Sequence, residues 1–431
     1  MFTKQTVKDI DINGKTVLVR ADFNVPLDKG KIADDYRIQQ ALPTLRYLLE
    51  HNAKVVVCSH LGRPDGQANP DFSLFPVAKR LGELLGADTV SFAKDCVGPD
   101  VHKAASALAG GQVLLLENLR FHPEEEKNDP AFAKQLVEST GAEVFVQDGF
   151  GVVHRAHAST EAVTHLLPAV AGFLLEKEVD TITNVMQNPE RPLMAVVGGA
   201  KISDKIEVLN KFIDIADVVA VGGAMANTFL LADGIDVAKS LVELDDVAIA
   251  KDILAKARAK AKAGNFIFYL PQDGVVAHAI DKQVPTRIID WSAHVISAIE
   301  NYPKRPPHAA SQIKPDEMIL DIGPFSASFI AGAMQLAKTV VWNGSLGVAE
   351  VAGLQGPVGP YAHGTRLVMD AILGQMGNKP FSLVGGGDTV SFIESQGLVE
   401  HFNHVSTGGG ASLELMAGRV LPGVAALLDK Q

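Results

Sequence analysis

The fold of this chain is decided by a short stretch near its start, Thr16-Val17-Leu18-Val19-Arg20-Ala21-Asp22-Phe23-Asn24. The stretch opens with a β-branched run of strand length, and charged and amide residues follow directly. A continuous run of this kind suits a strand that is covered on both faces, as in a parallel sheet. The polar residues then lie at the carboxyl end of the strand, where open α/β sheets bind their ligands.

The same pattern, a β-branched run closed by polar or glycine residues, recurs along the chain. The predicted strands cover residues 16–19, 54–58, 113–116, 143–146, 193–197, 217–221, 266–270, 339–342 and 381–384. Segments with helical periodicity lie between them, for example 37–51, 75–85, 201–215 and 246–263. This alternation of strands and helices predicts an α/β fold with parallel sheets.

The length of 431 residues predicts two domains, because a single core rarely grows beyond about 250–300 residues. Hydrophobic residues make up 47% and charged residues 21%, which is typical of globular proteins. A connecting helix is predicted near 174–187, because a proline at position 189 disfavours helix at the residue before it. We therefore expect an N-terminal lobe over residues 1–188 and a second lobe that begins at residue 189.

Charge and apolar patterning argue against several classes of protein. The net charge of -11 disfavours nonspecific nucleic-acid binding, which needs a positive surface. The sequence contains neither a run of about 20 apolar residues, as a membrane span needs, nor an N-terminal signal-peptide pattern. We expect a cytoplasmic protein that binds neither nucleic acid nor membranes. The two cysteines, Cys58 and Cys96, offer neither a disulfide framework nor the paired spacing of a zinc site, and Cys58 is expected to be a buried strand thiol.

Positive residues gather near strand ends and helix starts in the first half of the chain. They are Arg20, Arg37, His60, Arg63, Arg120, Arg155 and His157. Guanidinium groups bind carboxylate and phosphate with two parallel hydrogen bonds, and a small polyanion needs several of them from different strands. We therefore predict that these side chains converge on an anion. Asp22 and Asn24 are placed to orient the arginines or to accept from substrate hydroxyl groups, although such a pair also caps many turns.

Glycine closes the strands of the second half, at 198–199, 222–223, 344 and 385–387. The segment 198–205 is predicted to join a strand to a helix, with Lys201 and Lys205 on one face of the opening turn, where phosphate is favoured. It is equally possible that Lys201 and Lys205 are simply solvated and bind no phosphate. Asp388, inside a glycine-rich segment, suits Mg²⁺. The Walker A pattern and the GxGxxG fingerprint are both absent from the sequence.

Two further segments carry weaker signals. The acidic run 124–126 is predicted to be a solvated loop rather than a metal site. The segment 284–313 is polar and contains prolines, and no element is assigned to it. Its Trp291 is expected to pack locally rather than to mark a partner surface.

The stretch that decides the fold, extended to Pro26, resembles the signature segment of the phosphoglycerate kinases. Similar segments follow in order over nearly the whole chain, at 59–64, 117–121, 154–157, 198–201, 342–344, 386–389 and 406–413. The resemblance implies two Rossmann-like doubly wound parallel-sheet lobes joined by a helix. It also implies that the second lobe covers 189–405 and that a C-terminal hinge segment, 406–431, returns to the first lobe.

The resemblance implies a glycolytic, Mg²⁺-dependent kinase that is monomeric and moves a phosphoryl group reversibly between 1,3-bisphosphoglycerate with ADP and 3-phosphoglycerate with ATP. The phosphoglycerate would be held by Asp22, Phe23, Asn24, Arg37, His60, Leu61, Gly62, Arg63, Arg120 and Arg155. The nucleotide would be held by Lys201, Lys205, Glu350, Gly386, Gly387, Asp388 and Thr389, with Asp388 as the metal ligand. The catalytic candidates are Arg37, Lys201 and Lys205, because phosphoryl transfer depends on positioning and charge stabilisation.

The chain departs from the family pattern at Ser345, Ala349 and 354–361, close to Glu350. Two alternatives from other classes are a two-lobed protein that closes on a solute without chemistry and an NAD-dependent dehydrogenase. Lys201 and Asp388 argue against the first alternative, and the missing GxGxxG fingerprint argues against the second.

Overall fold

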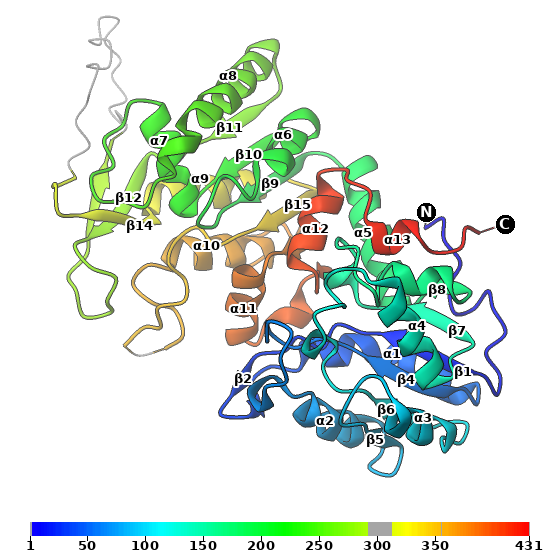
Figure 1. Cartoon of the computed structure of the whole chain (residues 1–431). Helices are drawn as coiled ribbons and strands as arrows, with labels where there is room; N and C mark the ends of the chain where they lie inside the picture. Colours follow the sequence, from blue (N-terminus) through cyan, green and yellow to red (C-terminus); the bar gives the residue numbers. More distant parts are fainter. Residues whose placement is uncertain (1, 292–312, 355, 431) are drawn as a thin grey trace, which may run out of the picture. The chain divides into compact units, whose positions relative to one another are not determined.

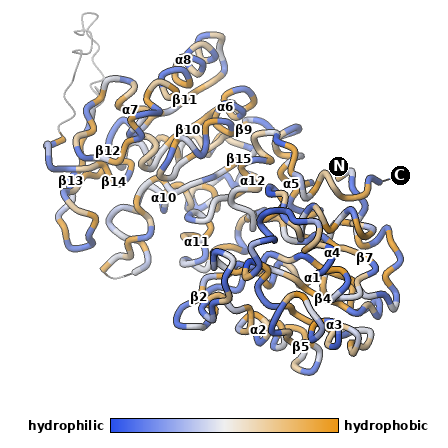
Figure 2. Tube along the Cα trace, in the orientation of Figure 1, coloured by the Kyte–Doolittle hydropathy of each residue, from blue (hydrophilic) through white to orange (hydrophobic). Residues whose placement is uncertain are grey.

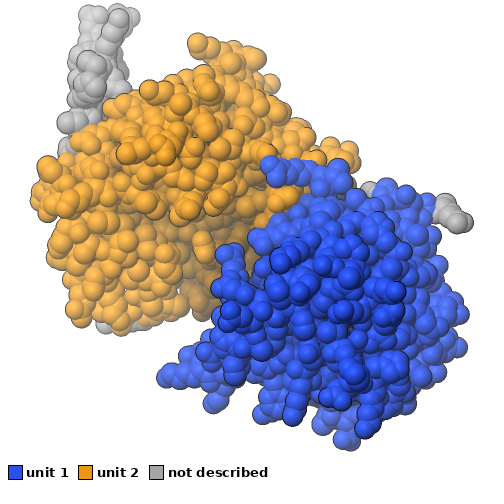
Figure 3. All heavy atoms as spheres, viewed as in Figure 1, with its two compact units in different colours: residues 1–183, 419–431 blue, residues 184–418 orange. Residues whose placement is uncertain are grey.

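The computed structural model describes residues 2–291, 313–354 and 356–430. The chain divides into two compact units (Figure 3). Unit 1 consists of Met1–Thr183 with Arg419–Gln431, and unit 2 consists of Asn184–Gly418. Helix α5 (Phe173–Gln187) therefore contains the point at which the chain passes from one unit to the other.

Unit 1 is built on a parallel sheet of six strands in the order β5-β6-β4-β1-β7-β8 (Figure 1). The strands are β1 (Thr16–Arg20), β4 (Lys54–Cys58), β5 (Val90–Phe92), β6 (Val113–Leu115), β7 (Val144–Gln147) and β8 (Ala169–Ala171). Strand β1 lies between β4 and β7, with Val17 opposite both Val55 and Val144. The strand order changes direction beside β1, so the polar residues after β1 lie at the point where α/β sheets leave room for ligands.

The other elements of unit 1 are helices, short 3₁₀ turns and a small hairpin. They are β2 (Leu27–Asp28), β3 (Lys31–Ile32), α1 (Tyr36–Glu50), α2 (Phe75–Leu85), α3 (Pro99–Ser106), α4 (Pro130–Thr140), α13 (Pro422–Ala425), η1 (Pro70–Phe72), η2 (Leu119–Phe121), η3 (Phe150–Val152) and η4 (Ala162–His165). Local chemistry sets the ends of α4. Asp129 accepts from the N–H groups of Ala131 and Phe132 before its first turn, and Gly141 ends it in the left-handed conformation at φ 63°.

Both ends of the described chain pack within unit 1. The backbone N–H of Lys430 donates to Thr3 O at 2.8 Å. The ammonium group of Lys4 lies 2.7 Å from Asp429 Oδ1. Farther along, the N–H of Gly423 donates to Val153 O at 2.9 Å. Residues 419–431 are thus held to unit 1 by pairing with its N-terminal residues and with the loop after η3.

Unit 2 contains a second parallel sheet of six strands, in the order β11-β10-β9-β15-β16-β17 (Figure 1). Its strands are β9 (Leu193–Val197), β10 (Val218–Val221), β11 (Ile267–Tyr269), β15 (Thr339–Asn343), β16 (Phe381–Gly385) and β17 (His404–Val405). The helices and 3₁₀ turns are α6 (Ile206–Ile215), α7 (Gly223–Ala232), α8 (Val247–Ala263), α9 (Pro324–Met334), α10 (His363–Ile372), α11 (Gly387–Ser395), α12 (Gly409–Met416), η5 (Leu244–Asp246) and η6 (Val399–His401). Both sheets fit the predicted doubly wound α/β class.

Unit 2 also contains a smaller antiparallel sheet, which was not expected from the sequence. It is formed by β12 (Asp273–Ala277), β13 (Arg287–Asp290) and β14 (Met318–Ile322), with β12 in the middle. Trp291 follows β13, is buried, and donates from Nε1 to Pro271 O at 2.8 Å. Its predicted local packing is confirmed. The rest of the unassigned segment, 292–312, lies outside the described residues.

The hydrophobic residues gather along the central strands of each unit, and hydrophilic residues follow the outer loops (Figure 2). Both cysteines are buried, as expected for Cys58. In the part of the chain that the structure describes, every helix is too short or too polar to cross a membrane.

Candidate active site

The residues after β1 hold a helix and a neighbouring loop in place. Arg37, the second residue of α1, donates from Nη1 to Asn24 O at 3.0 Å and lies 3.4 Å from Asp22 Oδ2. The side-chain oxygen of Asn24 accepts from the N–H of Gly62 at 2.8 Å. Burial alone would raise the pKa of Asp22, but the positive charges of Arg37 and Arg20 outweigh it and the pKa is lowered. Asp22 is therefore an ionised anchor for the arginines.

His60 is a buried histidine among positive side chains. Its Nδ1 lies 3.3 Å from Arg20 Nη2 and 3.9 Å from Asp22 Oδ1. Burial lowers the pKa of His60 well below its ordinary value, and the charges of nearby arginines, Arg20, Arg120 and Arg37, add to the effect against the opposing charge of Asp22. His60 is therefore neutral at physiological pH and adds a polar group without adding charge.

Arg120 and Arg155 belong to the same group of charges. Arg120, in η2 after β6, donates from Nη1 to Gly62 O at 2.9 Å. Burial lowers the pKa of the His157 imidazole to about 3, with Arg20, Arg120 and Arg155 as the next contributors. Arg20 and Arg120 contribute to the lowered pKa of both buried histidines, so these two arginines, from β1 and from the turn after β6, lie near each other. Convergence of the whole set on an anion stays a prediction.

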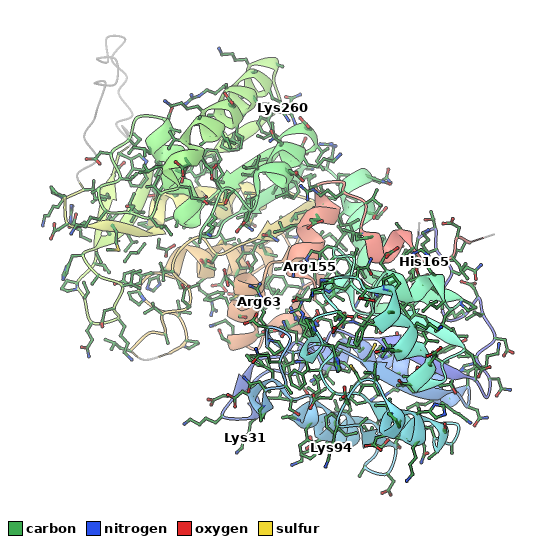
Figure 4. All side chains as sticks on the ribbon, viewed as in Figure 1. Lys31, Arg63, Lys94, Arg155, His165 and Lys260 are labelled. Carbon is green, nitrogen blue, oxygen red and sulfur yellow. The ribbon has the colours of Figure 1, made fainter. Side chains whose placement is uncertain are left out.

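The remaining residues predicted for the anion differ in exposure. Arg63 and Arg155 are exposed and lie on the same side of unit 1 (Figure 4). The side chains of Phe23 and Leu61 are buried in the hydrophobic core of unit 1, so only their backbone groups could meet a ligand. Asn118 fixes the backbone at Leu61, because its Nδ2 donates to Leu61 O at 2.7 Å.

Glu125 contradicts the prediction of a solvated loop over residues 124–126. Its side chain is fully buried, and its carboxylate accepts from the backbone N–H and the hydroxyl group of Ser159. The Ser159 hydroxyl also accepts from Arg20 Nε at 2.8 Å. A run of three acidic residues is usually solvated, and nothing in its local pattern shows that the middle one is buried against a serine 34 positions later.

The glycines at the ends of the unit 2 strands line a pocket of about 350 Å³. Its walls are formed by Gly199, Ala200, Lys201, Asp204, Lys205, Gly344, Gly386, Gly387, Asp388, Gly409, Gly410 and Leu413. Gly344 has φ +99°, and a Cβ atom there would lie 2.2 Å from Gly198 O. The two strand ends can approach this closely only with glycine at that position. The exposed backbone suits a phosphate chain.

Lys205 is a buried cation at the edge of this pocket, and its ammonium group donates to Asn343 Oδ1. Burial lowers the pKa of Lys205 to about 8, against the opposing charges of Asp204 and Asp388. Asn343 Nδ2 is also buried, and among the described residues it has no hydrogen-bond partner. A desolvated cation beside an unpaired amide fits an anionic ligand with acceptor oxygens.

The predicted placement of Lys201 and Lys205 on the first turn of a helix is wrong. Helix α6 begins at Ile206, and both lysines lie in the turn before it. The carboxylate of Glu243 accepts from the N–H groups of Ile202 at 2.5 Å and Ser203 at 3.2 Å. These backbone donors are therefore already used, and the lysines are left to face the pocket from a turn.

The glycine-rich segment after β16 places its residues differently. Gly386 precedes α11, and Gly387 and Asp388 open it, with Asp388 exposed beside the pocket. Thr389 is buried, and its hydroxyl oxygen accepts from the N–H of Gly344 at 2.7 Å. Thr389 thus ties two glycine segments together. A single carboxylate next to a site for phosphate suits Mg²⁺, which keeps water and phosphate oxygens among its ligands.

A second, mostly apolar pocket of about 210 Å³ adjoins the first, since Gly199, Ala200 and Asp388 line both. Glu350 lies on its wall, and further lining side chains are Leu230, Leu241, Met318, Leu346 and Val348. Nothing in the spacing of these apolar residues separates them from core residues, so the sequence does not reveal them. Ser345 O accepts from the N–H of Gly199 at 2.8 Å, and this backbone contact does not depend on the side chain at position 345.

The family model described as phosphoglycerate kinase matches residues 7–419. The chain belongs to the phosphoglycerate kinase family. It is 47% identical over 429 residues to the phosphoglycerate kinase of Moorella thermoacetica and 47% identical over 432 residues to that of Chloroflexus aurantiacus, with 100% of each chain covered. Among solved structures it resembles phosphoglycerate kinase from Coxiella burnetii, with a TM-score of 0.78, 35% identity and 98% of each chain covered. It also resembles that of Pyrococcus horikoshii, with a TM-score of 0.80, 31% identity and 99% and 98% of the chains covered.

The family confirms the predicted fold and the predicted activity. Phosphoglycerate kinases are glycolytic transferases that move a phosphoryl group with a carboxyl group as the acceptor, and this chain is such an enzyme. The alternatives of a solute-binding protein and of an NAD-dependent dehydrogenase are not supported.

Proposed function

We propose that 3-phosphoglycerate and 1,3-bisphosphoglycerate bind to the arginine cluster of unit 1, made of Arg20, Arg37, Arg63, Arg120 and Arg155. The observations that carry this proposal are contacts: Arg37 lies beside Asp22, Arg20 lies beside His60, and Arg120 donates to Gly62 O. Burial, together with the charges of Arg20 and Arg120, also lowers the pKa of His60 and of His157. Asp22 and Glu126 offset part of this positive charge, at 3.4 Å from Arg37 Nη1 and 3.1 Å from Arg120 Nε, and an anionic substrate would offset the rest. Asp22 and Asn24 orient Arg37, and Gly62 joins the loops that carry Asn24 and Arg120.

The nucleotide occupies the two adjoining pockets of unit 2. Its phosphates lie against Gly386, Gly387 and the glycines of the neighbouring strand ends, within reach of Lys201 and Lys205. Its base lies in the apolar pocket, with Glu350 on the wall of that pocket. Support comes from the shared lining of the pockets and from the unpaired Asn343 Nδ2 beside the Lys205 ammonium group.

Magnesium is the implied metal, and the residues present fit it. Asp388 would hold the ion, which when bound offsets the charge on the nucleotide phosphates. The residues beside it fit an anion that carries such an ion, because Lys205 is buried and Asn343 Nδ2 lacks a partner among the described residues. Asp388 is exposed, so its carboxylate is free to meet a hydrated cation.

The catalytic roles follow from where each cation lies. The phosphoglycerate carboxylate is already a nucleophile, so the reaction needs no general base. Arg37 steadies negative charge on the acceptor side, where Asp22 and Asn24 fix its guanidinium group. Lys201 and Lys205 steady charge on the donor side, and a desolvated ammonium group such as that of Lys205 does so more strongly than one in water.

The proposal is tested by ADP release from Mg-ATP with and without 3-phosphoglycerate, with the acyl phosphate product followed through its reduction by a coupled dehydrogenase. We expect turnover only with both substrates. The Arg37→Ala variant should lose most of this turnover. Nucleotide binding without turnover would contradict the proposed donor and acceptor sites.

The predictions of a monomer and of a cytoplasmic location stay predictions. Light scattering of the purified chain tests the first, and a particle with the mass of a single chain is the expected result.

A further inference from the structure

Asp95, Cys96 and His122 meet near one edge of the unit 1 sheet, outside the proposed substrate site. Asp95 and Cys96 lie in the loop after β5, and His122 directly follows η2, which itself follows β6. Because β5 and β6 pair in parallel, the loops that leave them are neighbours. A carboxylate oxygen, the thiol sulfur and an imidazole nitrogen, one from each residue, all lie within 4.8 Å of one another.

The side chains of Asp95 and His122 are held by further contacts. Asp95 Oδ1 accepts from the backbone N–H of Cys96 at 2.6 Å and lies 2.7 Å from His122 Nε2. The His122 ring stacks on Phe132, with ring centroids 5.2 Å apart and an interplanar angle of 30°. The ring orientation is therefore fixed with Nε2 directed at Asp95.

Two of the three side chains are exposed to solvent and the third is buried, so an ion could enter the site from solvent. The side chains of Asp95 and His122 are 54% and 28% exposed, whereas Cys96 is fully buried. An ion can reach the carboxylate and the imidazole from water and meet the thiol beneath them.

We propose that Asp95, Cys96 and His122 form a binding site for a divalent transition-metal ion of the Zn²⁺ class. Sulfur and imidazole ligands favour Zn²⁺ over Mg²⁺, which prefers oxygen ligands. The site belongs to unit 1, whereas Asp388 belongs to unit 2, so the two metals are separate in chemistry and in place.

Tetrahedral zinc geometry places its ligand atoms roughly 3.3–3.8 Å apart. The contact between Asp95 and His122, at 2.7 Å, must therefore open when the ion enters. Asp95 is the more exposed partner and lies in a loop, so its side chain can make this adjustment. A simple ion pair between Asp95 and His122 also explains their short contact. It does not explain why the Cys96 thiol lies beside them.

Titration of the full-length chain with Co²⁺, used as a spectroscopic probe in place of Zn²⁺, separates these two interpretations. A thiolate ligand produces a sulfur-to-cobalt charge-transfer band in the near ultraviolet. We expect this band in the unaltered protein, and we expect equimolar Zn²⁺ to remove it and millimolar Mg²⁺ to leave it unchanged.

The chain supplies a matched control, because Cys58 is its other cysteine and is also buried. The band should vanish in Cys96→Ser and persist in Cys58→Ser. His122→Gln, which changes a partly exposed side chain, should weaken Co²⁺ binding at least about tenfold. His122→Gln also tests the site if Cys96→Ser fails to fold, which circular dichroism would reveal. The proposal is overturned if the unaltered protein gives no band, if Cys96→Ser retains it, or if His122→Gln binds Co²⁺ as tightly as the unaltered protein.

Discussion

Ser159 donates two hydrogen bonds to the buried carboxylate of Glu125, from its backbone N–H at 3.0 Å and from its hydroxyl group at 2.6 Å. The hydroxyl oxygen in turn accepts from Arg20 Nε at 2.8 Å. Burial raises the pKa of Glu125, although the charge of Arg20 and the hydrogen bonds from Ser159 oppose the rise. Glu125, acting through Ser159, therefore positions Arg20 of the proposed anion site.

We expect Glu125→Gln to destabilise the protein by about 1–3 kcal/mol, because the amide group replaces an acceptor oxygen with a donor facing Ser159. The KM for 3-phosphoglycerate should also rise as Arg20 loses its fixed position. Urea unfolding and steady-state kinetics measure the two effects. Glu124→Gln is the matched control, since Glu124 is only partly buried, and it should change neither quantity. Equal stability of the two variants would contradict the role given to Glu125.

Arg37→Ala should lower kcat by roughly 10²–10³-fold, as expected when one preorganised donor to a developing charge is removed. Folding should be little affected, because Arg37 binds Asn24 O and Asp22 at the partly exposed start of α1. Coupled kinetics measure kcat, and thermal unfolding measures stability. Arg46→Ala, an exposed change on the same helix, is the control and should leave kcat unchanged. A normal kcat in a folded Arg37→Ala variant would refute the assignment.

Asp388→Asn should weaken binding of Mg-ADP at least about tenfold and leave binding of 3-phosphoglycerate nearly unchanged, because the two proposed sites belong to different units. Calorimetric titration with each ligand alone measures the two affinities. Glu400→Gln removes a negative charge from an exposed position elsewhere in unit 2 and should alter neither affinity. An equal loss of both ligands in Asp388→Asn would argue against separate sites.

The sequence predicts nine of the twelve parallel strands, because their hydrophobic runs are continuous, and misses the edge strands β5, β8 and β17, which are only two or three residues long. The runs at 54–58 and 193–197 coincide with β4 and β9. The antiparallel sheet of unit 2 was missed for the opposite reason. Strand β12 opens with the buried Asp273 and then Gly274, and β13 begins with Arg287 and ends with Asp290, so neither presents an unbroken apolar run.

Local sequence patterns select the site residues, whose roles stay predictions, and these patterns fail where contacts between distant residues decide the structure. We expect the arginines at the strand ends to converge, because parallel strands bring their carboxyl ends to one edge. The turn that carries Lys201 and Lys205 was read as helix, since a spacing of four suits one helix face. Glu243, far along the chain, binds the N–H groups of that turn instead. Burial of Glu125 likewise depends on Ser159, which no local pattern reveals.

The pH dependence of nucleotide use should report on Lys205. Burial lowers the pKa of its ammonium group from 10.5 to about 8, so the folded protein loses this charge as the pH rises through 8. If the charge binds the phosphates, kcat/KM for Mg-ATP should fall above pH 8, by about tenfold per pH unit. The effect of pH on stability runs in the opposite direction, because removing the proton from the buried Lys205 ammonium group relieves the cost of burying its charge. The unfolded chain keeps the proton up to about pH 10.4, so the contribution of Lys205 to stability increases as the pH rises from about 8 towards that value.

Lys205→Arg keeps its charge throughout this range, so its kcat/KM, although lower, should show no decline centred near pH 8. Lys211→Arg, on helix α6, is the matched control and should retain the profile of the unaltered enzyme. Profiles measured at constant ionic strength with saturating 3-phosphoglycerate give the comparison. An alkaline decline at the same pH in Lys205→Arg would assign the titration to another group and leave Lys205 without a role in binding through its charge.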